Sequence, residues 1–288
     1  MLALSLLAAG ASLGCGSGSS QVSLPPVSAA GVNHISGFTP SGPVPAGKPV
    51  KLSFTIVQPN GQPLTRYATG PGPHTGVHLI FVRKDLADIV HLHPPIGPDG
   101  KISETVTFPA PGPWMLLTDV YQKQSGTSIP LNYQLKQDLQ VKGRYVPKPL
   151  GRVRTSVTTD GYTFTIHHLP KLKVANADYL NVSVTDPGGK AATFTPWFGA
   201  LAHAVFFRQG NLAYFHTHIC SPNLPLCAAN SAIAGSSTKP GQLKIGMVFP
   251  QAGKWRLFLQ GQIGDKIVTA PFSLDVRSLD LCHRRDGS

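Results

Sequence analysis

Acidic side chains are scarce in this chain of 288 residues, which contains 13 Asp and Glu against 25 Lys and Arg. Hydrolysis by paired carboxylates needs residues that are rare here. Outside the N-terminal apolar segment, where Gly10-Ala-Ser12-Leu-Gly14 follows no expected strand, the sequence has no Gly-x-Ser-x-Gly element, and it lacks a P-loop and a dinucleotide-binding fingerprint. No run of five or more Lys and Arg occurs, so the net charge of +12 reflects missing acids more than a basic patch. We therefore expect neither an enzyme nor a nucleic-acid partner.

Long apolar runs are also missing, because the apolar stretch from Met1 to Gly14 is shorter than the ~20 residues that a membrane-spanning helix needs. Its length and small-residue end are typical of a secretory signal. Cys15 follows it and precedes a Gly-Ser-rich tether, which resembles a bacterial lipoprotein signal with Cys15 as the lipidated residue. We expect a signal segment at 1–15, a flexible tether at 16–45 and a lipid anchor in the cell envelope. Cleavage with secretion, or an uncleaved anchor, are the alternatives.

Cysteine is rare as well, with four residues in the chain. In an oxidising envelope, Cys220 and Cys227 are expected to close the short loop between them with a disulfide. Cys282, in the polar tail, is then left over, and its pairing with either loop cysteine is the alternative.

The sequence contains an internal repeat. His78-Leu-Ile-Phe-Val-Arg83 aligns with His203-Ala-Val-Phe-Phe-Arg208, and the same shift places His91-Leu-His93 on His216-Thr-His218. Further along, Phe108-Pro-Ala-Pro-Gly-Pro-Trp114 aligns with Phe249-Pro-Gln-Ala-Gly-Lys-Trp255, after an insertion that contains the loop cysteines. Three motifs that recur in the same order indicate two copies of one domain.

Frequent turn residues, with 30 Gly and 27 Pro, separate short segments rich in β-branched and aromatic residues. This pattern predicts an all-β fold of two tandem immunoglobulin-like β-sandwich domains, at 46–143 and 153–277, with a linker at 144–152 and a polar tail at 278–288. Trp114 and Trp255, at equivalent strand starts, are expected to anchor the two cores. Strands are expected at 51–57, 78–83, 89–93, 101–108 and 114–121, and at 162–166, 179–185, 202–208, 212–218, 243–249, 255–263 and 266–276.

Six of the eleven histidines fall in the repeated motifs. If each motif forms a hairpin with an even loop, the first histidine lies opposite one of the later two, and all three project from one face; with an odd loop they do not. At the ~4.5–5.5 Å spacing of opposed residues, three imidazoles can reach one copper or zinc ion. We therefore expect one metal site per domain, formed by His78, His91 and His93 in the first and by His203, His216 and His218 in the second.

Asp119 is a candidate fourth ligand in the first domain, where His74 also lies close in sequence, and Gln260 is the poorer counterpart of Asp119. Only neutral imidazole binds metal, so occupancy should fall below pH ~6.5. The competing interpretation is a non-catalytic structural or interaction protein whose histidines brace the hairpins by hydrogen bonds. A cupin-like metalloenzyme is less favoured, because the Glu that its first motif places after His218 is absent.

The same motifs carry a family resemblance. His78-Leu-Ile-Phe-Val-Arg-Lys-Asp-Leu86 with His91-Leu-His93-Pro, and Gly210-Asn-Leu-Ala-Tyr-Phe-His216-Thr-His218, resemble tandem immunoglobulin-like domains of bacterial secreted proteins and lipoproteins. Those domains are similar to YtkA-like and copper-resistance (CopC-type) domains, and the resemblance covers residues 46–276. It implies copper or heavy-metal handling together with a protein partner in that process. Ile219 and Cys220 replace the Pro that the family carries after its second His-x-His.

Overall fold

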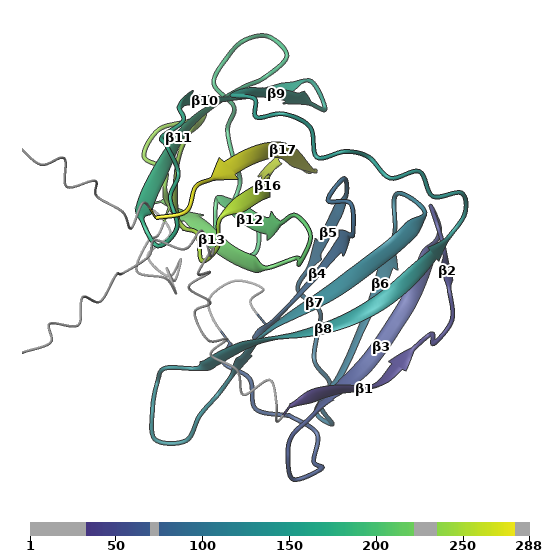
Figure 1. The fold of residues 1–288 in the computed structure, drawn as a ribbon. Coiled ribbons are helices and arrows are strands. Elements are labelled where there is room, and N and C mark those ends of the chain that lie inside the picture. The colour runs from purple at the N-terminus through teal and green to yellow at the C-terminus, as the bar shows by residue number, and fades with distance from the viewer. Residues whose placement is uncertain (1–32, 70–74, 222–234, 280–288) are drawn as a thin grey trace, which may run out of the picture.

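The computed structural model describes residues 33–69, 75–221 and 235–279, and all regular secondary structure within these ranges is β (Figure 1). No helix in this part of the chain is long and apolar enough to span a membrane. The strands of domain 1 are β1 (His34–Thr39), β2 (Val44–Pro45), β3 (Pro49–Val57), β4 (Val77–Arg83), β5 (Ile89–Leu92), β6 (Lys101–Thr107), β7 (Gly112–Gln122) and β8 (Leu131–Lys142). Those of domain 2 are β9 (Ser156–Thr159), β10 (Tyr162–His168), β11 (Ala177–Thr185), β12 (Ala202–Arg208), β13 (Tyr214–Cys220), β14 (Gly235–Ser236), β15 (Gln242–Val248), β16 (Gly253–Ile263) and β17 (Lys266–Val276).

Domain 1 is a sandwich of two sheets, with strand orders β1-β3-β6 and β2-β8-β7-β4-β5. Side chains of a strand alternate between the two faces of its sheet. On β3 this alternation buries Leu52, Phe54 and Ile56, which share one hydrophobic core with Leu79 and Phe81 of β4. The two sheets are therefore joined by the inward-facing positions of their central strands.

Domain 2 repeats this arrangement. Its strands β10-β11-β15 correspond to β1-β3-β6, and β17-β16-β12-β13 correspond to β8-β7-β4-β5. The short β14 pairs with both β13 and β15, so the two halves form one continuous sheet folded around a second core. The chain is thus all-β with two tandem immunoglobulin-like β-sandwich domains, as the sequence predicts.

The two repeated tryptophans occupy the same place in each core. Trp114 Nε1 donates a hydrogen bond to the carbonyl of Ala110 at 3.1 Å, and Trp255 Nε1 donates one to the carbonyl of Gln251 at 3.0 Å. Both rings are fully buried, and each packs edge-on against the phenylalanine that begins its motif. Their predicted role as core anchors is confirmed.

The structure corrects the expected tether. From His34 onward the chain belongs to domain 1, because β1 pairs with β3 and its Ile35 and Phe38 pack against the core. The strand β8 was also not predicted. Its Tyr133, Leu135 and Val141 alternate with polar residues, so only one face of this strand meets the core.

A third hydrophobic cluster joins the two domains. Ile80 and Val82 of β4 lie on the face opposite Leu79 and Phe81, and they pack with Val205 and Phe207 of β12. Leu150, in the segment expected as a linker, is buried in the same cluster. This interdomain core explains why both repeated hairpins are apolar on both faces, and it places the β4–β5 hairpin beside β12 and β13 (Figure 1).

Arg256 of β16 forms hydrogen bonds that connect the two domains at the edge of the interdomain core. Its Nε donates to the carbonyl of Leu86 at 3.0 Å, and its Nη2 donates to the carbonyl of Leu150 at 2.9 Å. Leu86 lies in the β4–β5 turn of domain 1, so one buried guanidinium connects both domains and the segment between them. Charged donors to buried carbonyls make stronger hydrogen bonds than neutral ones.

Candidate metal centre

The register of both hairpins places the three histidines of each repeat on one face. In domain 1, Leu79 pairs with Leu92 and Ile80 with His91. In domain 2, His203 pairs with His218 and Val205 with His216. Both hairpins therefore have the even parity that the expected sites require. The face that carries the histidines is also the face that carries the interdomain core.

As a result, the six histidines lie together between the domains. Within each domain, the rings of His78 and His93 stack with centroids 4.0 Å apart, and those of His203 and His216 lie 5.2 Å apart. Across the junction, His78 and His216 are 5.3 Å apart, and His91 and His203 are 5.1 Å apart. The two expected sites therefore lie side by side, because the two hairpins face each other and their histidines form one cluster.

Three groups within this cluster bring their ligand atoms within 4.8 Å of one another: His78, His91 and His93; His91, His203 and His216; and His78, Asp119 and His216. Two of the three take residues from both domains. In a tetrahedral site with Zn–N bonds of ~2.0–2.1 Å, two ligand nitrogens lie about 3.3 Å apart. The contacts between His91 and His93 Nε2 atoms, at 3.2 Å, and between His203 Nδ1 and His216 Nε2, at 3.0 Å, are close to that value.

Two of the rings are oriented by partners that can only accept. His203 Nε2 donates to the backbone carbonyl of Trp197 at 2.9 Å, so the Nδ1 of the neutral ring keeps its lone pair and points at His216. His91 Nδ1 donates across the junction to Gln260 Oε1 at 3.3 Å, which leaves Nε2 as the ligand atom. Metal-binding histidines usually have their second nitrogen fixed in this way.

Asp119 and Gln260 occupy the same position in the two repeats, each paired with the first histidine of its domain. Asp119 Oδ2 lies 3.8 Å from His78 Nδ1. Its carboxylate also accepts hydrogen bonds from four side chains that the sequence does not predict to be part of the site: Tyr121, Asn132, Gln134 and, from domain 2, Tyr214. These residues come from three strands, so no local motif indicated them.

Trp197 and Phe198 cover the side of the cluster near Gln260. Phe198 stacks on His93 with ring centroids 3.8 Å apart, and Trp197 lies edge-on to His91 at 5.4 Å. Phe198 has a φ of 47°, in the left-handed region that non-glycine residues rarely adopt. A paired turn between Trp197 and Ala200 holds this conformation. No local sequence pattern indicates this cover, because it depends on how the two domains pack.

The environment favours uncharged histidines. Burial, with a smaller contribution from repulsion by His218, lowers the pKa of His91 to about 3. Burial and the neighbouring histidines, His218 foremost, hold the pKa of His216 well below its ordinary value. Burial also raises the pKa of the Asp119 carboxyl, although its four hydrogen-bond donors counteract the shift. Neutral imidazole is the form that binds metal ions.

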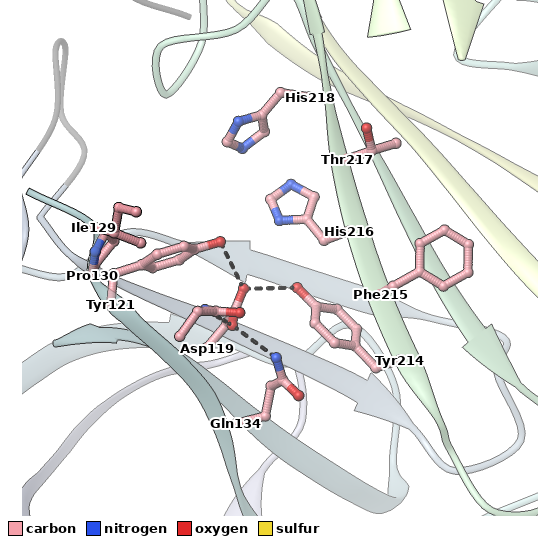
Figure 2. A pocket seen from close by; sticks show the side chains of 11 residues that line it. Asp119, Tyr121, Ile129, Pro130, Gln134, Tyr214, Phe215, His216, Thr217 and His218 are labelled. Atoms are coloured by element: carbon pink, nitrogen blue, oxygen red, sulfur yellow. Dashed lines mark hydrogen bonds between the residues drawn. The ribbon is translucent and has the colours of Figure 1, made fainter. Parts of the chain in front are cut away.

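A cavity of about 280 Å³ adjoins the cluster on the side of Asp119 (Figure 2). On β13, His216 and His218 project toward it, whereas Phe215 and Thr217 point to the other face of the strand (Figure 2). The opposite wall consists of Asp119, Tyr121, Asn132 and Gln134, with Ile129 and Pro130 at its edge. Whereas His78 and His203 are fully buried, His216 and His218 are only half-buried, so they form the accessible side of the cluster.

The remaining predicted residues fall elsewhere. Cys220, at the end of β13, is disulfide-bonded, and both cysteines considered as its partner, Cys227 and Cys282, lie outside the described residues. Cys15 and His74 lie outside them too. His167 and His168 are exposed at the end of β10, far along the chain from the cluster motifs.

Comparisons with known proteins add little about function. Residues 156–278 match a family described as a domain of unknown function (DUF8832). The comparison with curated proteins gives no match. Fibronectin(III)-like modules of CbhA from Clostridium thermocellum are 11% identical, with 88% of this chain and 100% of that chain covered and a TM-score of 0.22. A tetra-tandem repeat from a large adhesion protein is 11% identical, with coverages of 85% and 49% and a TM-score of 0.27. Because both TM-scores are low, these similarities support no inference about ligands or partners.

Proposed function

We propose that this is a metal-binding protein of the cell envelope that holds copper or zinc in one centre formed by both domains. The observation that carries the proposal is the convergence of six histidines between the domains, five of which form overlapping groups with metal-ligand spacing together with one carboxylate. Imidazole-rich sites suit zinc and copper, and the affinity order of divalent ions places Cu(II) highest. The fixed second nitrogens of His91 and His203 support the same conclusion.

The signal-like segment supports a place for this activity. A lipidated Cys15 would attach the protein to the outer side of a membrane, where it would bind or deliver metal together with a protein partner. Replacement of Cys15 by Ala should then move the protein from the membrane fraction to the soluble fraction. Retention of that variant in the membrane fraction would argue against the lipid anchor and leave the metal centre untouched.

Equilibrium dialysis of the purified protein against Cu(II) and Zn(II) at neutral pH tests the metal proposal. A single shared centre predicts saturable binding that is almost abolished by the double substitution His78→Ala and His91→Ala, which removes a member of all three ligand groups. The matched control, His167→Ala with His168→Ala, removes two exposed histidines and should bind as the wild type does. Loss of only half the bound metal would indicate two independent sites. No saturable binding by the wild type would favour the rival function, in which the histidines only brace the hairpins.

A further inference from the structure

The two sides of the histidine cluster are chemically unequal, although they come from a repeat. On one side the residue beside the first histidine is Gln260, and Trp197 and Phe198 cover the neighbouring rings. On the other side the equivalent residue is Asp119, which lines the cavity with His216 and His218. The carboxylate therefore lies on the side where the cluster meets the cavity.

The three metal-ligand groups overlap in a regular way. Any two of them share one histidine: His91 links the first and second groups, His78 the first and third, and His216 the second and third. Each group also has one member of its own, which is His93, His203 or Asp119. An ion that moves from one group to another therefore has one histidine in common between its starting and final groups.

We propose that the metal ion is taken up through this cavity, is held first by Asp119, His78 and His216, and then passes by ligand exchange to the histidine-only groups. This inference rests on the proposed metal-binding function and concerns the route by which the ion reaches its site. Two ligands are exchanged: in passing to the first group the ion loses its bonds to Asp119 and His216 as bonds to His91 and His93 form, and in passing to the second it loses those to Asp119 and His78 as bonds to His91 and His203 form. The charge and redox state of the ion do not change.

The cavity suits a hydrated cation. At ~30 Å³ per water molecule, an ion with six waters needs roughly 200 Å³, which the cavity of about 280 Å³ accommodates. Asp119 is the carboxyl ligand of the cluster and lines the cavity, and a cleft lined by negative charge raises the association rate of a cation by about 10-fold or more. Tyr121, Asn132 and Tyr214 donate hydrogen bonds to this carboxylate and hold it in position.

Borderline metals favour nitrogen ligands over a carboxylate oxygen, which gives the exchange its direction. The receiving groups lie farther from the cavity, because Asp119 lines it and His91, His93 and His203 do not. His91 and His93 are buried beneath the Trp197–Phe198 turn, whereas His216 remains in contact with the cavity. The order of uptake is therefore carboxylate first and imidazoles second.

Stopped-flow absorption with Cu(II) and the metal-free full chain tests the route. The wild type should show a fast phase whose rate rises with Cu(II) concentration, followed by a slow phase that does not depend on it. Asp119→Asn should lower the rate constant of the fast phase about 10-fold, a larger factor than its effect on equilibrium affinity. Asp119→Glu, which keeps the charge, should restore most of the rate, and His93→Gln should remove or diminish the slow phase.

The control Asp265→Asn makes the same change of net charge at an exposed turn and should leave both phases unaltered. Equilibrium dialysis of the same samples separates the two proposals. Binding that is saturable but follows a single phase, or a fast phase that is equally rapid in Asp119→Asn, overturns the uptake route alone. Absence of saturable binding by the wild type overturns both the route and the metal-binding function.

Discussion

At the scale of single residues, the buried histidines make stability depend on pH. His91 has a pKa of about 3 in the folded protein, against an ordinary value of 6.5. Between these values the unfolded chain binds a proton that the folded chain does not, so the free energy of unfolding falls as pH falls below about 6.5. From pH 7 to pH 5 the contribution of this one group is about 2 kcal/mol.

We therefore expect the metal-free wild type to lose more stability than His91→Gln over the same pH interval. Urea unfolding at pH 7 and pH 5 measures both losses, and their difference isolates His91 from the opposite contribution of Asp119. That carboxyl has a raised pKa, so the stability linked to its proton is lost as pH rises. Equal losses for the two proteins would show that the pKa of His91 is the same in the folded and unfolded states, which contradicts this prediction.

Arg256 is a second residue with a measurable structural role. Arg256→Met keeps the apolar stem but leaves the buried carbonyl of Leu86 without this donor, while Leu150 still accepts from Ser273 Oγ at 2.6 Å. We expect the free energy of unfolding to fall by about 2–4 kcal/mol. Chemical denaturation measures the loss, with Arg154→Met at an exposed position as the control. A similarly small decrease in the free energy of unfolding for both variants would contradict the role of Arg256 in connecting the two domains.

At the scale of elements, adjacent residues of β12 are buried in two different hydrophobic cores, that of domain 2 and that between the domains. Phe206 faces the core of domain 2 and stacks on Phe215, whereas Phe207 faces the interdomain core beside Tyr214. Truncation of either ring costs about 3–5 kcal/mol. The consequences should nevertheless differ, because Phe206→Ala destabilises the sandwich itself and Phe207→Ala weakens the docking of the two sandwiches.

Small-angle scattering and circular dichroism distinguish these outcomes. Phe207→Ala should increase the radius of gyration while the β-sheet signal is retained, and Phe206→Ala should reduce the β-sheet signal and lower the unfolding midpoint of domain 2. If Phe207→Ala instead loses the β-sheet signal as Phe206→Ala does, the two domains do not fold independently of their junction.

The elements also show what can be predicted from sequence. Repetition, turn residues and alternation predict the central strands, because these depend on local periods. The hairpin parity stays open in the sequence and is given by the observed strand register. The sequence does not predict that His216 approaches His78, since that contact depends on two sandwiches docking. The feature that indicates docking is the apolar second face of β4 and β12. Its residues Ile80 and Val205 would be exposed in an isolated domain, and an exposed apolar face marks an interaction surface.

At the scale of the whole molecule, metal binding and domain docking should be thermodynamically linked. Two of the three ligand groups draw on both domains, so an ion in them binds only while the domains are docked. With ligand at 100 times its dissociation constant, binding to the folded state alone adds about 2.7 kcal/mol to the free energy of unfolding. For a chain of this size, that corresponds to a rise of roughly 5–10 °C in the unfolding midpoint.

Differential scanning calorimetry with and without Zn(II) measures this rise, and EDTA should reverse it. Phe207→Ala provides the decisive comparison, because it keeps every metal ligand and changes only the interdomain core. A shared centre predicts that this variant binds Zn(II) more weakly, since part of the binding free energy must now restore the docked arrangement. Two independent three-histidine sites would bind equally well in the wild type and in Phe207→Ala, and that result would contradict a centre built by both domains.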